Sequence, residues 1–203
     1  NELVAIYGNF INRVFVLTHK YYNGIVPKAK ILSSKDDEIL NLMSEIPEKI
    51  GYAIENYRFR EASQILMQLA RYGNKYLADS EPWKLIKTNP DRVLSIMNTA
   101  IQVSVGLAVV SRPFLPNTAK KLNDMLNINT LALRWDDISL KKELIPSGHQ
   151  IKKSNLLFEK IDNIQIEQQL AKLNSNGKVN QETKISPIKP VTSYKNFDSL
   201  NLQ

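Results

Sequence analysis

The chain contains no cysteine among its 203 residues and only two histidines, His19 and His149. Without cysteine it forms no disulfide and no zinc–thiolate site, and it has no thiol nucleophile. Two histidines alone do not supply a typical set of zinc ligands, so we expect no metal site. The absence of cysteine is also compatible with a cytoplasmic location, which is the location we expect.

The common sequence motifs of catalysis are missing too. The chain has seven glycines, but no Gly-rich phosphate loop and no Ser-centred nucleophile elbow. Asp36-Asp37 fits a helix start and Asp136-Asp137 fits a polar loop better than either pair fits acid–base chemistry. His19 is most simply a surface residue. We therefore assign no catalytic residue and no cofactor to this chain.

One apolar run has to be distinguished from a membrane span. Residues 95–110 contain no charged side chain. The run is shorter than the ~20 apolar residues that a bilayer requires. Asn98 and Gln102 also interrupt it. We expect a buried core helix and no membrane partner.

The charge of the chain favours a polyanionic partner. Lys and Arg outnumber Asp and Glu by 27 to 20, which gives a net charge of +7 and a pI near 9.4. Nucleic acid and an anionic membrane surface both fit this balance. The lysines that could meet phosphates are Lys28, Lys30, Lys141, Lys142, Lys152 and Lys153. Scattered lysines, however, often serve only solubility.

The first predicted helix spans residues 2–22 and has two unequal faces. A step of 100° per residue gathers apolar side chains on the larger arc and polar ones in a narrow wedge. A helix that is apolar around most of its girth is expected at the centre of its domain. Asn9 and Arg13 lie one turn apart on the polar wedge, so an amide and a guanidinium point the same way. Asn23-Gly24 is a usual helix end.

The next two helices are marked by their starts and their periodicity. Ser34 with Asp37 predicts the start of a second helix. Pro47 lies in its middle and should kink it. A third helix, with an inner face that begins at Phe59, is expected to end near Asp79.

Two more long helices follow and complete the predicted fold. Asn89-Pro90 starts a fourth helix that runs to about Arg112, and Pro116 opens a fifth that runs to Leu126. Beyond them, Leu133 and Trp135 should pack back on the bundle, and 145–148 is a turn. Residues 164–173 predict a last amphipathic helix. The fold class is therefore all-α, a bundle of about five long helices.

The binding candidates are Asn9, Arg13 and Trp83. Unpaired RNA bases stack on aromatic rings and are read along their edges by amides and guanidinium groups. Two simpler interpretations compete with this one. Asn9 and Arg13 form an ordinary solvated face, or Trp83 fills the core, where Trp is usually well buried.

The chain resembles the C-terminal anticodon-binding domain of bacterial methionyl-tRNA synthetases. The resemblance covers residues 1 to about 173, and it rests on ordered segments at 1–4, 8–14, 21–24, 79–84, 112–119, 145–149 and 157–161. It implies a helical bundle that recognises the CAU anticodon of methionine tRNAs. In that family an Asn and an Arg four residues apart on the first helix, and a Trp after a proline, contact the anticodon bases, especially the first cytosine.

Those family positions match Asn9, Arg13 and Trp83 here, with Pro82 restricting the backbone that presents the ring. The family's catalytic signatures, His-Ile-Gly-His and Lys-Met-Ser-Lys-Ser, do not occur. The resemblance implies that a parent enzyme joins methionine to its tRNA with ATP, whereas this chain carries no catalytic centre. Because the sequence begins at Asn1 without an initiator methionine, we expect it to be part of a longer chain.

The C-terminal region divides into two predicted segments. Residues 174–190 are rich in Asn, Ser, Gly, Lys, Gln and Pro, which predicts a flexible linker. Residues 191–203 resemble the first strand of the OB-fold tRNA-binding domain that some synthetases of this family carry, and through which the parent commonly forms a homodimer. One strand alone does not form a barrel.

Two other functions fit the residues. A sister class I synthetase for another apolar amino acid would share the bundle and read other anticodon bases. A basic helical interaction module would bind a protein and read no RNA. Salt separates the second from RNA binding, because phosphate contacts weaken steeply as salt rises.

Overall fold

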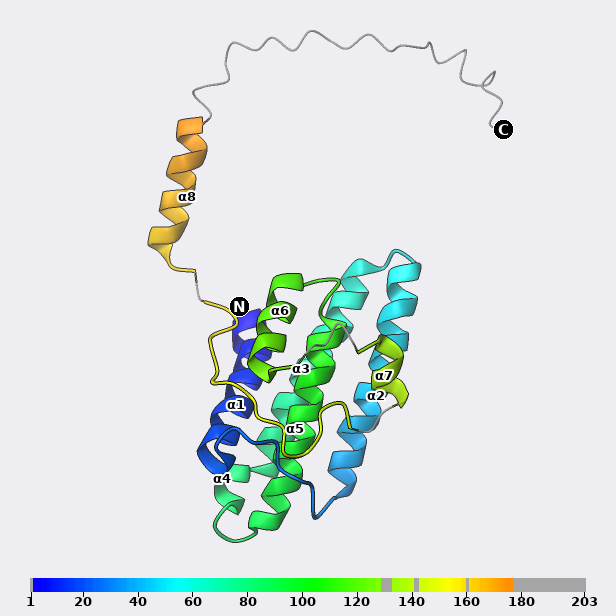
Figure 1. Cartoon of the computed structure of the whole chain (residues 1–203). Helices are drawn as coiled ribbons and strands as arrows, with labels where there is room; N and C mark the ends of the chain where they lie inside the picture. The colour runs from blue at the N-terminus through cyan, green and yellow to red at the C-terminus, as the bar shows by residue number, and fades with distance from the viewer. Residues whose placement is uncertain (1, 129–132, 141–142, 160, 177–203) are drawn as a thin grey trace, which may run out of the picture. The chain divides into compact units, whose positions relative to one another are not determined.

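The computed structural model describes residues 2–128, 133–140, 143–159 and 161–176 (Figure 1). The elements within these ranges are η1 (Leu3–Gly8), α1 (Asn9–Tyr22), α2 (Ser34–Glu55), α3 (Phe59–Ser80), α4 (Pro82–Leu85), α5 (Pro90–Val110), α6 (Pro116–Leu126), α7 (Trp135–Leu140) and α8 (Asn163–Asn176). The β pairing found in the described part of the chain is an isolated bridge between Ile25 and Gln150. The predicted all-α fold is confirmed.

Helix α5 is the centre of the bundle. Every residue from position 99 to position 110 is buried. Helices α1, α2, α3, α4, α6 and α7 all contact α5. It is long and apolar enough to cross a membrane, but 89% of its most apolar window is buried inside the fold. The prediction of a buried core helix is confirmed.

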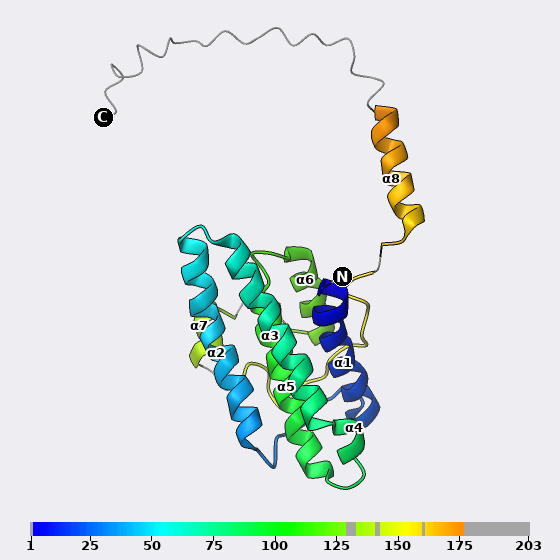
Figure 2. The same ribbon diagram turned by 180° about the vertical axis from the view of Figure 1, so that it is seen from behind.

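The first helix is not central, and that prediction is wrong. Helix α1 packs mainly on α3 and α5 and lies at the side of the bundle in both views (Figures 1 and 2). Val16 on its outer surface is 47% exposed, and Leu3 and Val4 in the preceding η1 are 36% and 37% exposed. Sequence periodicity identifies an apolar arc but does not say whether other helices cover all of it.

Helices α2 and α3 form an antiparallel pair beside α5. The capping box of α2 uses Ser33 and Asp36, one residue earlier than the predicted Ser34 and Asp37. Pro47 lies inside α2, which continues through it to Glu55. Phe59, predicted on the inner face of α3, is 57% exposed and meets Tyr57 edge-on instead of entering the core.

A buried polar network ties three helices together. Arg92 on α5 forms two parallel hydrogen bonds, of 2.7 and 2.8 Å, with the fully buried carboxylate of Asp36. Tyr76 on α3 donates a further hydrogen bond to Asp36. Burial works against ionisation, but the hydrogen bonds from Arg92, Tyr76 and the Ser33 backbone outweigh it and lower the pKa of Asp36. The predicted helix-start role of Asp36 is confirmed, and its pairing with Arg92 was not foreseen.

The segment after α6 returns to the bundle. Leu133 and Trp135 pack against the core, as predicted. Asp136 and Asp137 lie in the first turn of α7, so the prediction of a polar loop there is wrong. Acidic residues suit the positive end of a helix dipole, and this local signal for a helix start was missed. Lys141 and Lys142 lie outside the described residues.

Gln102 holds the following turn in place. Its buried side-chain oxygen accepts hydrogen bonds from the backbone N–H groups of Leu144 and Ile145, and its amide donates to the carbonyl of Ile145 at 2.9 Å. Residues 145–148 form the predicted turn. A polar residue inside the apolar run of α5 therefore anchors the chain that covers it.

The chain divides into two compact units after residue 160, whereas the sequence predicted a helical domain through residue 173. The predicted terminal helix is present as α8 in the second unit and runs on to Asn176. Its apolar residues Ile164, Ile166, Leu170 and Leu173 are all exposed. The rest of the predicted linker at 174–190, and the OB-like segment 191–203, lie outside the described residues.

Candidate nucleic-acid interface

Asn9 is the first residue of α1 and follows a π-helical segment. In η1 the hydrogen bonds run to the fifth residue instead of the fourth, so the 100° step used for the sequence prediction does not apply there. Leu3 and Val4, which lie in this segment, are at the surface. The side chain of Asn9 is exposed. π-Helical turns often occur at functional sites.

Close packing fixes α1 against α3. A Cβ atom on Gly73 would lie 2.7 Å from two carbons of the Phe10 ring, a distance that real side chains do not tolerate. Phe10 is fully buried. Beside this contact, the Asn74 side-chain amide donates to the Ile6 carbonyl at 2.7 Å. The absence of a side chain at Gly73 therefore lets α1 approach α3 closely.

Tyr7 secures the same helix end from inside the bundle. Its hydroxyl group lies 3.3 Å from the Leu107 carbonyl and 3.2 Å from the Ser111 hydroxyl. Burial raises the pKa of Tyr7 well above its ordinary value, so the hydroxyl stays protonated and remains a donor. Asn9 thus projects from a helix end that is anchored on α5.

Helix α4 presents the aromatic ring. Helix α3 ends at Ser80, and Glu81 adopts a left-handed conformation with φ of 41°. Pro82 occupies the first turn of α4, where its missing N–H leaves no bond unmade, and it is buried. Glu81 also pairs with Lys84 at 2.7 Å. The reversal at Glu81 and the fixed Pro82 place Trp83 at the surface on a short, defined turn.

The structure brings Arg13 and Trp83 together. The guanidinium carbon of Arg13 lies 5.0 Å from the centroid of the Trp83 ring, within the range of a cation–π interaction. Trp83 is 37% exposed, so it does not fill the core. Arg13 is half-buried, and Asn9 lies one helical turn before it on the same helix. Pro82 supports the ring from within the fold and is not itself an exposed contact residue.

A hollow adjoins Asn9 on the side of the C-terminal segment. It has a volume of about 190 Å³, and it is lined by Val4, Gly8, Asn9, Ile11, Asn12, Asn155, Leu156, Leu157 and Phe158. The Phe158 ring contacts Tyr7 edge-on at 5.7 Å. Asn12 and the 155–158 segment were not among the predicted site residues. Asn12 carried a sequence signal, because it lies on the predicted polar wedge.

Both histidines hold this C-terminal segment. His19 Nε2 donates to the Lys152 carbonyl at 2.8 Å, and His149 Nε2 donates to the Leu126 carbonyl at 2.9 Å. His19 thus lies at the surface, as predicted, and its hydrogen bond to the C-terminal segment was not foreseen. A backbone carbonyl accepts hydrogen bonds only, which assigns the donor role to each imidazole. Gly24, with φ of 79°, leaves the space that the His19 ring occupies.

The fold has solved counterparts. A free-state crystal structure of methionyl-tRNA synthetase from Mycobacterium tuberculosis superposes with a TM-score of 0.71, at 18% identity, over 80% of this chain and 33% of that one. The same bacterium's enzyme with bound methionyl-adenylate gives a TM-score of 0.71 at 19% identity over 78% of this chain and 32% of that one. At these identities the comparison establishes the fold alone, which is a helical bundle found within a larger synthetase.

Sequence comparison defines the family. The family described as the anticodon-binding domain of methionyl tRNA ligase matches residues 26–178. The chain belongs to this family. It is 49% identical to a methionine–tRNA ligase of Christiangramia forsetii and 46% identical to one of Flavobacterium psychrophilum, in both cases over the whole chain and over 30% of the relative. The chain thus spans about a third of the length of the curated relatives that it matches.

Proposed function

We propose that this chain is the part of a methionine–tRNA ligase that binds the CAU anticodon of methionine tRNAs. The observation that carries the proposal is the position of the Arg13 guanidinium over the Trp83 ring, with Asn9 one turn before Arg13 on the same helix. An amide and a guanidinium therefore lie one turn apart on α1, and the guanidinium meets an indole ring. These are the groups that read and stack unpaired RNA bases.

The donors and acceptors match a cytosine edge. Cytosine offers a 4-amino donor beside two acceptors on its Watson–Crick edge. In the proposed complex the Asn9 carbonyl accepts from the 4-amino group, and Arg13 donates to the acceptors. Trp83 provides a stacking surface, which contributes about 1–3 kcal/mol per base. Uracil carries an acceptor where cytosine carries the amino group, so the same site would reject it.

Titration of anticodon stem-loops tests this proposal. The chain is titrated with a CAU stem-loop and with one in which only the first anticodon base is changed to U. A lost specific contact costs about 1–3 kcal/mol, so the UAU affinity should be about 5-fold to 150-fold weaker. Equal affinities would overturn the proposed reading of the first anticodon base. No RNA binding at all would favour a protein-binding module.

The wider activity belongs to the proposed ligase as a whole. ATP and methionine would be used by a catalytic domain that residues 1–203 do not contain, because the family's two catalytic signatures do not occur here. We expect the isolated chain to support no methionine-dependent ATP–pyrophosphate exchange; measurable exchange would contradict this. We place the ligase in the cytoplasm with its tRNA, and its dimerisation through an OB-fold domain stays a prediction.

A further inference from the structure

A second hollow borders the one beside Asn9. It has a volume of about 350 Å³ and is lined by Lys121, Asp124, Met125, Lys152, Lys153, Asn155, Leu156 and Leu157. Residues 155–157 line both hollows. The segment 155–157 therefore separates the two hollows. Polar side chains of α1 lie on one side of it, and a group of lysines lies on the other.

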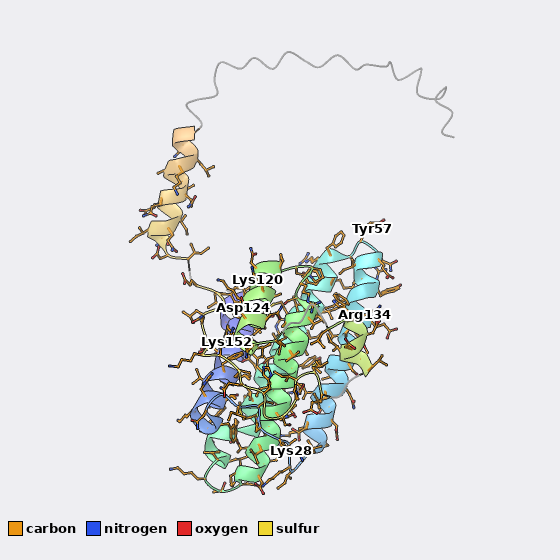
Figure 3. All side chains as sticks on the ribbon, in the orientation of Figure 1. Lys28, Tyr57, Lys120, Asp124, Arg134 and Lys152 are labelled. Atoms are coloured by element: carbon orange, nitrogen blue, oxygen red, sulfur yellow. The ribbon has the colours of Figure 1, made fainter. Side chains whose placement is uncertain are left out.

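The charge of this hollow is uneven. Three ammonium groups, on Lys121, Lys152 and Lys153, surround one carboxylate, that of Asp124. All three lysines are exposed, and no ion pair of theirs is found within the described parts of the chain. Figure 3 labels Asp124 and Lys152 on the same side of the bundle as α6 and α1. We name Lys121, Lys152 and Lys153 the lysine wall.

Other hollows of the same domain have a different charge. The groove between α2 and α3 is lined by two lysines, Lys35 and Lys75, and by two acidic residues, Glu38 and Asp79, so its charges balance. A hollow on α2 is acidic, with three glutamates and one lysine. The excess of positive charge is therefore a local property of the lysine wall and not simply the net charge of the chain.

The backbone beneath the lysine wall is fixed. The Lys152 N–H donates to the Met125 carbonyl at 2.8 Å, and the Lys152 carbonyl accepts from His19. Ile151, the preceding residue, is buried, and its N–H donates to the Gly24 carbonyl. Helix α6, which carries Lys121, is joined to the first helix through this segment. The backbone that carries these lysines therefore needs little ordering on binding.

We propose that the lysine wall binds backbone phosphates of the strand that leaves the anticodon reading site. The inference rests on the proposed function, and it adds a sequence-independent contact to a site that otherwise reads bases. Base contacts specify while phosphate contacts position the nucleic acid. A loop whose base meets Asn9 would continue over residues 155–157, beyond which the three ammonium groups lie. Asp124 opposes the phosphates and moderates their binding.

The test compares two double variants with the same loss of charge. Lys121→Gln/Lys152→Gln weakens the lysine wall, and Lys35→Gln/Lys75→Gln weakens the balanced groove. Affinity for the CAU stem-loop is measured over a series of salt concentrations. Affinity falls as salt rises, and each lost phosphate contact makes the plot of log affinity against log salt less steep by about 0.7–0.9. The plot for the first variant should therefore be less steep by about 1.4–1.8, and the plot for the second should be nearly unchanged.

Asp124→Asn supplies the opposite change on the same surface. Removal of its charge should strengthen stem-loop binding by about twofold to fivefold, the range of an exposed charge interaction. The preference for CAU over UAU should not change in any of these variants, since phosphate contacts carry no sequence information. A lysine-wall variant that keeps the native salt slope, or that loses slope no more than the control, overturns the inference.

The outcomes also separate this inference from the proposed function. If the native chain prefers CAU but the lysine-wall variants show the wild-type salt dependence, only the phosphate site is contradicted. A native chain that binds stem-loops without preference contradicts anticodon reading, and its salt slope still decides on the lysine wall. If the native chain binds no stem-loop, both are wrong. Circular dichroism melting of each variant shows that the fold is retained.

Discussion

The guanidinium of Arg13 lies over the indole ring of Trp83, with 5.0 Å between the guanidinium carbon and the ring centroid. The contact joins the helix that carries Asn9 to the short helix α4. Each residue limits the motion of the other, so a donor group and an aromatic surface are held in place, as the proposed RNA site requires. Preorganisation of this kind reduces the entropy cost of binding.

Replacement of Trp83 should separate binding from folding. Trp83→Ala is expected to weaken binding of the CAU stem-loop by about 1–3 kcal/mol, because it removes the stacking surface. Trp83 is 37% exposed, so the melting temperature should fall little. Trp83→Phe, which keeps a ring, should lose less affinity. Unfolding of the alanine variant, seen by circular dichroism, would instead assign Trp83 to the core.

Asn9→Ala should relax discrimination at the first anticodon base. We expect the preference for CAU over UAU to fall towards one, since the variant lacks the amide that we propose to accept from the cytosine amino group. Asn41→Ala, a change of the same kind at an exposed position of α2, is the control and should keep the preference. If Asn9→Ala weakens both stem-loops equally, Asn9 positions the RNA and does not read it.

Gly73→Ala should loosen the joint between α3 and α1. The added Cβ atom would lie 2.7 Å from the Phe10 ring, and overpacking of this kind costs about 1–3 kcal/mol. Gly51→Ala is a matched control, because it adds the same methyl group to a helix position with no atom within 4 Å. It should stabilise the fold by about 0.5–1 kcal/mol. Urea unfolding gives the free energy of unfolding of each variant. Equal changes for Gly73→Ala and Gly51→Ala would contradict the close packing of Gly73 against Phe10.

The pair formed by Asp36 and Arg92 should make stability depend on acid. The folded-state pKa of Asp36 lies below its ordinary value of 3.8. Its contribution is therefore fully present above pH 3.8 and is lost as the pH falls through the lower folded value. Asp36→Asn should lower the free energy of unfolding by about 3–5 kcal/mol at pH 7, because Arg92 loses its buried partner. The difference in free energy of unfolding between the variant and the wild type should become smaller below about pH 4.

Asp91→Asn is the control for this prediction. Asp91 pairs with Lys30 at 2.9 Å, but both side chains are about half exposed, so the pair contributes about 0–1 kcal/mol. Urea unfolding at pH 7 and pH 3 is the measurement. A gap for Asp36→Asn that stays constant between these pH values would contradict the assigned ionisation of Asp36.

Most of the helix boundaries could be predicted from local sequence. Asn23-Gly24 ends α1, Asn89-Pro90 starts α5 and Pro116 starts α6, because caps and turns depend on residues that are neighbours in the chain. The apolar run in α5 was also recognised as core. The choice of Asn9, Arg13 and Trp83 as readers came from the family resemblance and stays a prediction.

The identity of the central helix and the contacts between distant side chains could not be predicted in this way. Periodicity predicts an apolar face, but the number of helices that cover this face depends on how all of them pack. The central position expected for α1 is occupied by α5. The contact of Arg13 with Trp83, the pair of Asp36 with Arg92 and the lysine wall each unite residues from different segments. Such contacts arise from the packing of helices, which no local pattern of residues specifies.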